Sequence, residues 1–179
     1  MNIDKKKLVD GCIEKKNWAY KEMYRRYQPM LLGICYRYAK EKSEAEDILL
    51  KGFMNIFQKI HMCNSPESLE AWLRKSMINT AIDHYRKYHK RAKHEDILDH
   101  ENNMIINSDQ LSQLTEKEIL KLIQQLPDGY RMVLNLFVFE GYSHQEIAQK
   151  LNISENTSKT QLRKARKHIA LKLRDYYRQ

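Results

Sequence analysis

The segment that most constrains the fold of this 179-residue chain is Gly141–Ile169. Ser143 and Glu146 stand three residues apart just before an apolar stripe, which is the capping-box arrangement that begins a helix. Asn152 tolerates a left-handed backbone, and Ser154 can cap a second helix directly after this tight turn. A short helix, a tight turn and a longer helix form a helix-turn-helix, whose second helix enters the major groove of DNA.

The second helix of this motif has one apolar and one polar face. Apolar residues recur at three- and four-residue spacing, as on the buried side of a helix: Leu162, Ala165, Ile169 and Leu173. The opposite face carries side chains able to contact base edges or phosphates: Asn156, Lys159, Thr160, Arg163 and Lys167. Residues 143–179 hold nine Lys/Arg and three Asp/Glu, a net charge of +6. A basic face behind a capped turn predicts DNA binding, whereas a basic face alone also suits a solvated helix of an unrelated bundle.

The whole chain is basic and contains few residues that interrupt helices. Its formal net charge is +9 and its pI is about 9.4. This charge favours nucleic acid over a membrane as partner, because no basic helix carries a wide apolar face. Five Gly and three Pro, with apolar residues at helical spacing, predict an all-α fold. No apolar segment is long enough to span a membrane and no signal-peptide core is present, so we expect a cytoplasmic protein.

The cysteines and acidic residues do not form a recognisable catalytic or metal site. Cys12, Cys35 and Cys63 are widely spaced, which suits buried, reduced thiols; a redox-sensing Cys35 or Cys63 is the alternative. The sequence has no CxxC or HxxxH spacing, so we expect no metal and no cofactor. Scattered carboxylates and the lack of a Gly-rich phosphate loop argue against a nuclease or recombinase, so we expect no catalytic residue and no small-molecule substrate.

Four helical patterns occupy the first half of the chain, over residues 4–16, 18–38, 43–60 and 69–93. Ser43 and Glu46 predict a capping box for the third pattern. The end of the fourth, from His84 to Lys93, holds five Lys/Arg and no acid, interleaved with aromatic rings. Such a surface suits single-stranded or melting DNA, and it equally suits a solvated helix end favoured by the helix dipole.

The charge of the sequence changes from basic to acidic after Lys93. Residues 95–116 hold six Asp/Glu and no Lys or Arg, with frequent Asn and Ser, which is typical of a linker between domains. We therefore expect two small helical domains joined by an acidic linker: a first domain over residues 1–94, the linker over residues 95–114, and a domain containing the helix-turn-helix over residues 115–179.

The second domain is predicted to begin at a further capping box formed by Thr115 and Glu118. The apolar run over residues 130–140 contains β-prone residues, so its local preference is ambiguous. Its length and the bracketing Pro127 and Gly141 favour a buried helix. This gives the second domain four helices.

Four motifs occur in a fixed order along the chain. They are Ala45-Glu-Asp-Ile-Leu with Phe53; Ala71-Trp-Leu with Ile78-Asn-Thr-Ala-Ile-Asp83 and Tyr85-Arg-Lys; Leu126-Pro-Asp with Arg131 and Val133; and Glu140-Gly-Tyr-Ser with Glu146-Ile-Ala and Leu162-Arg-Lys-Ala-Arg. In this order and at this spacing, the motifs resemble the extracytoplasmic-function (ECF) group of the sigma-70 family, bacterial initiation factors of RNA polymerase. The resemblance covers roughly residues 14–173.

The resemblance implies a sigma factor, not itself an enzyme, that directs core polymerase to specific promoters for DNA-templated transcription initiation. In the family, the first domain docks on the clamp helices of the β′ subunit and reads the −10 element, and the second reads the −35 element. The positions that match the polymerase contact are Asp47, Leu50 and Lys51. Those that match the −10 contact are Asn79, Asp83, Arg86 and Lys87. Those that match the −35 contact are Ser154, Glu155, Asn156, Lys159, Thr160, Arg163 and Lys167. The resemblance also implies an anti-sigma factor as partner.

Two sites depart from the family pattern. Leu50 and Lys51 stand where Gln-Glu is usual, and Ser158 stands where an apolar residue normally packs between the two helices of the motif. A hydroxyl buried there in place of a methyl pair costs roughly 1 kcal/mol, so Ser158→Val is expected to raise thermal stability. The alternative to a sigma factor is a stand-alone helix-turn-helix repressor or activator whose N-terminal domain binds a ligand or dimerises.

Overall fold

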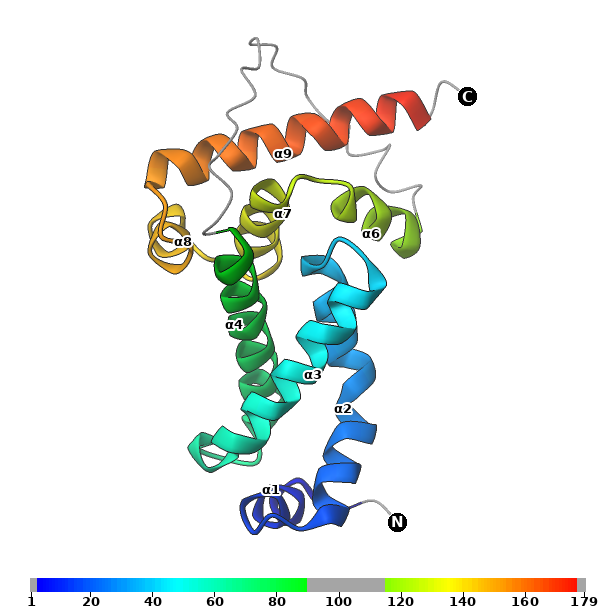
Figure 1. Cartoon of the computed structure of the whole chain (residues 1–179), viewed down its shortest axis with the longest axis vertical. Coiled ribbons are helices and arrows are strands. Elements are labelled where there is room, and N and C mark those ends of the chain that lie inside the picture. Colours follow the sequence, from blue (N-terminus) through cyan, green and yellow to red (C-terminus); the bar gives the residue numbers. More distant parts are fainter. Residues whose placement is uncertain (1–2, 90–114, 177–179) are drawn as a thin grey trace. The chain divides into compact units, whose positions relative to one another are not determined.

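The computed structural model describes residues 3–89 and 115–176, and every regular element within these two ranges is helical (Figure 1). The predicted all-α fold is therefore confirmed. The acidic linker expected over residues 95–114 lies outside the described residues. The chain forms two compact units, Met1–His84 and Tyr85–Gln179, each of which has its own packing.

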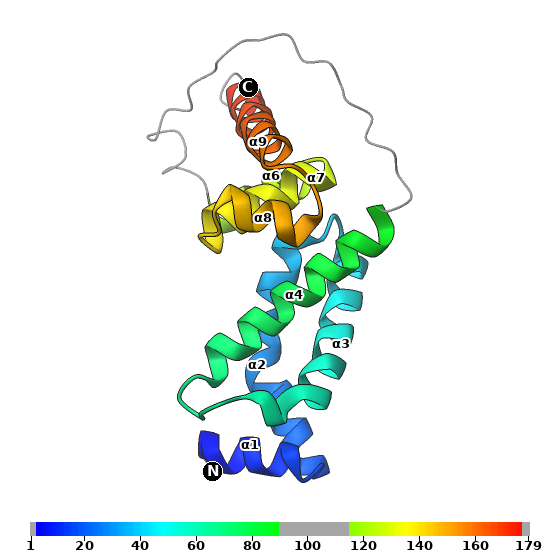
Figure 2. The same ribbon diagram turned by 90° about the vertical axis from the view of Figure 1, so that its left-hand side faces the viewer.

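The first unit contains α1 (Lys5–Ile13), α2 (Asn17–Tyr38), α3 (Lys42–Lys59), the 3-10 turn η1 (Ile60–Met62) and most of α4 (Leu69–His89), whose end from Tyr85 onward is assigned to the second unit. The longest of these, α2, packs along α3, while α1 packs against both α2 and η1 (Figure 2). Contacts at Asn55 and Gly52 are among those that join α3 to α4. The Asn55 side-chain amide donates a hydrogen bond to the Thr80 hydroxyl at 3.1 Å. A Cβ at Gly52 would lie 2.3 Å from Met77 Sδ, so glycine at this position permits the close approach of the two helices.

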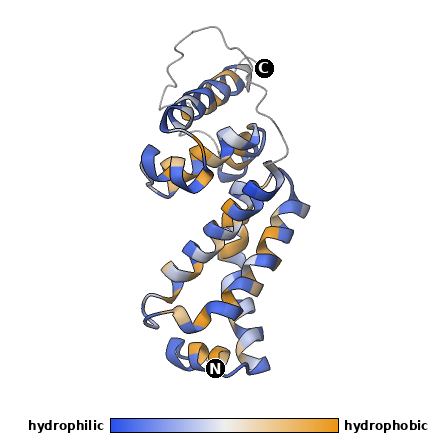
Figure 3. Ribbon diagram, turned by 60° about the vertical axis from the view of Figure 1, so that its left-hand side comes forward, coloured by the Kyte–Doolittle hydropathy of each residue, from blue (hydrophilic) through white to orange (hydrophobic). Residues whose placement is uncertain are grey.

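Apolar side chains from all four helices fill the interior of the first unit. The largest fully buried ones include Leu8, Met23, Leu31, Phe53, Ile56, Leu73 and Met77. Most helices show alternating hydrophobic and hydrophilic positions along their length, as amphipathic helices do (Figure 3). The aromatic residues of α2 are only partly core, because Trp18 and Tyr24 remain 41% and 44% exposed. Both tryptophans of the chain, Trp18 and Trp72, belong to this unit.

The capping box predicted at Ser43 and Glu46 is wrong. The helix α3 begins at Lys42 and its N-cap residue is Glu41, whose side chain makes no capping hydrogen bond. Instead, the carboxylate of Glu44 accepts a hydrogen bond from the Lys40 amide at 2.6 Å. The Ser43 hydroxyl donates to the Glu41 carboxylate at 2.8 Å and is therefore not available as a cap. The carboxylate that caps the N-terminal end of α3 is therefore that of Glu44, the third residue of the helix, and not that of Glu46.

The second unit contains α6 (Glu116–Gln124), α7 (Asp128–Leu134), the π-helical turn η2 (Asn135–Phe139), α8 (His144–Leu151) and α9 (Glu155–Tyr176). The long helix α9 packs against the three shorter ones, α6, α7 and α8. The apolar run predicted as a helix is helical, and its last turn has π geometry. The capping box of Thr115 and Glu118 is confirmed, since the Thr115 amide donates to the Glu118 carboxylate at 2.8 Å.

A buried arginine joins the end of α6 to α7. Arg131 is 2% exposed. Its guanidinium donates hydrogen bonds to the carbonyl oxygens of Gln124, at 3.2 Å, and Leu126, at 2.7 Å. It also forms an ion pair with Asp128. The same cation therefore satisfies carbonyl groups left over at the end of one helix and a carboxylate in the first turn of the next.

Candidate DNA and polymerase interfaces

Two caps and one left-handed residue fix the backbone path between α8 and α9. The Ser143 hydroxyl accepts a hydrogen bond from the Glu146 amide at 3.2 Å, and the Glu146 carboxylate accepts from the Ser143 amide at 2.8 Å. The bond from the Ser143 amide, and a second one donated by the Ser143 hydroxyl at 2.8 Å, lower the pKa of the Glu146 carboxyl. Asn152 has φ 57° and ψ 48°. The Ser154 hydroxyl accepts from the Thr157 amide at 2.9 Å, which caps α9. The predicted helix-turn-helix geometry is confirmed.

The outer side of α9 carries the residues predicted to face DNA. Asn156, Lys159 and Arg163 are exposed, and Thr160 and Lys167 are half-buried. Lys159 Nζ lies 2.7 Å from the Glu155 carboxylate, and this pairing lowers the pKa of Glu155. From residue 156 to residue 174 the helix carries seven Lys/Arg and no Asp or Glu. Such a surface is suited to a phosphate backbone, and the individual DNA contacts stay predictions.

The inner side of α9 is buried largely as its spacing predicts. Leu162, Ala165 and Leu173 are at most 4% exposed. Ser158 is also fully buried, but its hydroxyl lies 2.9 Å from His144 Nδ1. The expectation that Ser158→Val raises stability assumed a buried hydroxyl without a partner, and this assumption is wrong. The hydroxyl contacts His144, a contact that the spacing of the residues in the motif does not indicate.

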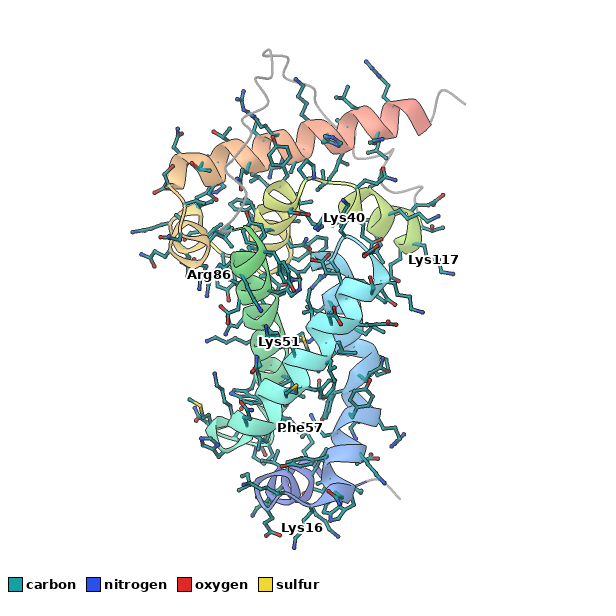
Figure 4. The ribbon with its side chains drawn as sticks, viewed as in Figure 1. Lys16, Lys40, Lys51, Phe57, Arg86 and Lys117 are labelled. Atoms are coloured by element: carbon teal, nitrogen blue, oxygen red, sulfur yellow. The ribbon has the colours of Figure 1, made fainter. Side chains whose placement is uncertain are left out.

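One side of α4 presents the residues predicted to read the −10 element. Asn79, Asp83, Arg86 and Lys87 are separated by four, three and one residues, which places them on one face of the helix. Arg86, labelled in Figure 4, is half-buried, whereas the other three are exposed. Among the rings nearby, Tyr88 is 61% exposed and lies 5.9 Å from Lys87 Nζ. His84 instead lies 3.5 Å from the Glu44 carboxylate of α3. Of these two rings, Tyr88 is the one presented to solvent for stacking, whereas His84 packs within the unit.

One side of α3 presents the residues predicted to dock on polymerase. Asp47, Leu50 and Lys51 are exposed. Figure 4 labels Lys51 on α3. Sequence reasoning missed Met54, although it stands four residues after Leu50 and therefore on the same face. Leu50 and Met54 are 62% and 56% exposed, which is unusual for large apolar side chains. We call these four residues the α3 face.

The two described buried cysteines are poorly suited to redox sensing. Burial raises the pKa of the Cys12 thiol to about 11 and that of Cys35 to about 12. Since the thiolate is the reactive form, both thiols are almost entirely in the unreactive state near neutral pH. Cys63 is only partly buried, and its Sγ lies 3.4 Å from the Ser65 carbonyl oxygen, to which it donates.

We expect Cys63 to be the first cysteine to react with a thiol reagent. In the native protein at neutral pH, a chromogenic disulfide should titrate one thiol rapidly and the other two only after denaturant is added. Cys63→Ser should remove the rapid phase, and the matched Cys35→Ser variant should keep it. Rapid reaction of more than one thiol in the native protein would contradict the burial of Cys12 and Cys35.

The described residues contain no group of three or more His, Cys, Asp or Glu arranged to hold a metal ion. Among the described helices, none combines the length and apolar character needed to cross a membrane. The features that stand out are instead three helix faces, on α3, α4 and α9, with the residue types that contact macromolecules.

Known proteins share both units of this chain. The family described as Sigma-70 region 2 matches residues 23–91, and the family described as Sigma-70, region 4 matches residues 116–169. The ECF RNA polymerase sigma factor SigM of Bacillus subtilis (strain 168) is 30% identical over 151 residues, which span 83% of this chain and 91% of SigM. The chain belongs to the ECF sigma factors of the sigma-70 family. It is an RNA polymerase sigma factor, and a stand-alone regulator is not favoured.

Further relatives extend the likeness over most of this ECF sigma factor. The RNA polymerase sigma-H factor of Pseudomonas aeruginosa is 24% identical over 173 residues, 90% of each chain. Among solved structures, the sigma factor RpoE in complex with the anti-sigma factor NepR from Bartonella quintana has a TM-score of 0.50 at 19% identity. That match covers 87% of this chain and 96% of RpoE, and it supports the fold. The helix α1 precedes both matched family segments.

Proposed function

We propose that the two parts of this ECF sigma factor contact different promoter elements. A first domain, residues 1–94, binds core polymerase through the α3 face and the −10 element through α4. A second domain, residues 115–179, binds the −35 element through α9, and residues 95–114 link the two. The observation that carries this proposal is the basic face of α9, which holds no Asp or Glu from residue 156 to residue 174, directly after a fully capped tight turn. The protein has no catalytic activity of its own and acts in the cytoplasm.

The chemistry of α9 supports major-groove reading near its N-terminal end. Asn156 lies in the first turn, and an amide can both donate to and accept from the edge of an adenine. Lys159 and Arg163 follow at one-turn intervals and can hold the flanking phosphates. In this arrangement Lys159 exchanges its exposed ion pair with Glu155 for a contact with a phosphate, and the loss of such an exposed pair costs little.

The end of α4 supports binding of a melting −10 element. Asn79 is an exposed amide, and Lys87 and Tyr88 place a cation beside an exposed ring two turns further along. Bases that leave the duplex can stack on such a ring while the cation holds their phosphates. Asp83 lies between them on the same face and can accept from the amino group of a base.

An anti-sigma factor is the further partner that we propose. RpoE of Bartonella quintana, which shares this fold, was solved with the anti-sigma factor NepR. The exposed apolar residues of the α3 face are the kind of surface that such an inhibitor covers in competition with polymerase.

Run-off transcription tests the proposed function. Core polymerase from the source organism is supplied with fragmented genomic DNA, with and without this protein. Discrete new transcripts that depend on the protein, each preceded by two shared sequence elements, are the expected result. DNA binding without transcripts, or transcripts only when another sigma factor is added, would overturn it.

Arg163 and Asn156 should affect DNA binding in different ways. With a duplex carrying the −35 element, Arg163→Ala should weaken binding to all sequences alike and reduce the salt slope by about 1, because a phosphate contact is lost. Asn156→Ala should cost about 1–3 kcal/mol on the cognate duplex only. Lys121→Ala, which removes an exposed lysine on α6, is the matched control and should change neither quantity. Equal effects of the three changes would contradict the proposed orientation of α9.

A further inference from the structure

A polar contact links α8 to α9 inside the helix-turn-helix. His144 is the first residue of α8, and its Nδ1 lies 2.9 Å from the Ser158 hydroxyl of α9. Ser158 is 0% exposed, whereas His144 is half-buried. The Phe137 ring of η2 stacks on the imidazole, with centroids 4.6 Å apart and planes 23° apart. The Arg166 guanidinium of α9 lies 6.0 Å from the Phe137 centroid. Three elements therefore meet at this one imidazole.

The contact stands where two helices of such a motif are commonly held by apolar packing alone. A hydrogen bond differs from apolar packing because it is directional, and it specifies the position of one helix relative to the other. The effect of removing this hydrogen bond also depends on whether one partner or both are replaced. Loss of either partner alone leaves a buried polar group unsatisfied, while replacement of both by apolar groups can be nearly neutral.

We propose that His144 is a positioning residue for α9, and that its neutral imidazole is the form that holds the recognition helix in its DNA-binding position. This inference rests on the proposed reading of the −35 element by α9. In a helix-turn-helix, the first helix crosses the DNA backbone while the second enters the groove. The angle between α8 and α9 must therefore satisfy both sets of contacts at once, and the His144–Ser158 hydrogen bond joins the two helices directly.

The surroundings of the imidazole favour its neutral form. Burial lowers the pKa of His144 below its ordinary value of 6.5, and the positive charge of Lys159 and, to a smaller extent, Arg166 lowers it further. Glu155 acts in the opposite direction. All three charges are on α9, and η2 contributes the uncharged Phe137 ring. Because the folded protein binds this proton less readily than the unfolded chain, stability is full above about pH 6.5 and falls as the pH drops toward the lower pKa of the folded state.

The test compares His144→Phe, which keeps a ring against Phe137 but removes the hydrogen bond, with His144→Asn, which keeps a polar nitrogen near Nδ1 but cannot be protonated. Duplexes are first enriched from a random library with the full-length wild-type protein. The readout is the dissociation constant for a scrambled duplex divided by that for an enriched duplex. Nonspecific electrostatic attraction between the basic protein and DNA contributes equally to both constants, so it drops out of this ratio. His144→Phe and Ser158→Val should each lower the ratio about five- to tenfold. His144→Asn should retain most of it.

The double variant and the pH profile separate positioning from a merely structural effect. His144→Phe combined with Ser158→Val should recover the ratio to within about threefold of wild type, because no buried polar group is then left unsatisfied. The wild-type ratio should stay level above about pH 6.5 and fall as the pH drops below that value toward the lowered pKa of His144, while that of His144→Asn stays level. Additive losses in the double variant, or one pH profile shared by wild type and His144→Asn, would overturn the inference. Failure of the wild-type protein to enrich any sequence would instead overturn the proposed function, and the positioning inference with it.

Discussion

Replacing Arg131 with methionine should lower the free energy of unfolding of the second unit by about 3 kcal/mol. Methionine keeps much of the volume but removes a guanidinium that is 2% exposed. The carbonyl groups of Gln124 and Leu126 then lose their donor, and the Asp128 carboxylate loses its cation. Each of these groups is costly to leave without a partner at a partly buried site. For a unit of this size the melting temperature should fall by on the order of 15 °C, as measured by far-ultraviolet circular dichroism of the full-length protein.

Arg163→Met is the matched control for this experiment, because Arg163 is an exposed arginine of the same unit. Its effect on unfolding should stay within about 0.5 kcal/mol. Arg131→Lys should be nearly as harmful as Arg131→Met, since a single ammonium cannot reproduce the planar fork that reaches two carbonyls and a carboxylate. A melting temperature for Arg131→Met equal to that of the Arg163→Met control would show that the buried guanidinium does not hold α6 and α7 together.

Changing both Leu50 and Met54 to serine should weaken binding of core polymerase by about 30-fold, the equivalent of about 2 kcal/mol. In the family pattern this face is polar and acidic, whereas here Lys51 stands at the acidic position. Because no acidic side chain is present at that position, we expect the two exposed apolar side chains to supply much of the affinity. Titration of labelled core polymerase with each variant measures the effect.

The stability of the Leu50, Met54 double variant should be unchanged, because both side chains are more than half exposed and contribute little to the core. Met62→Ser is the matched control, as Met62 is 57% exposed but belongs to η1 and lies outside the α3 face. Equal polymerase affinity for the double variant and for Met62→Ser would exclude the α3 face as the docking surface.

The features that the sequence predicted correctly depend on residues close together in the chain. The caps at Ser143 and Thr115 and the left-handed Asn152 each involve groups within a few residues, so spacing alone specifies them. The same reasoning failed at Ser43, because acidic residues on both sides offered alternative partners and a shift of one residue in the helix start decided between them. The helical period also indicated the outward sides of α3, α4 and α9, although Arg86, Thr160 and Lys167 are half-buried rather than exposed.

The features that the sequence did not predict depend on contacts between elements. Periodicity shows which side of α9 is buried, but it does not show that the group opposite Ser158 is the imidazole of His144. From the sequence, Arg131 is recognisable only as part of a motif. Its structural role is not, because the carbonyl groups that accept its hydrogen bonds lie at the end of the preceding helix. The π geometry of η2 leaves no mark in a run that is apolar at nearly every position. Such partners become visible only when the helices are placed in space.

Because Trp18 and Trp72 both belong to the first unit, the intrinsic tryptophan fluorescence of the protein reports on that unit alone. Both indoles belong to the first unit, Trp18 against Gly11 and Trp72 on α4, and the second unit contains no tryptophan. Indole emission should therefore respond to events at α1, α2 and α4 and be silent to changes confined to the helix-turn-helix. A fluorimeter and unlabelled protein are then sufficient to follow the melting of the two halves separately, with circular dichroism reporting both and emission reporting one.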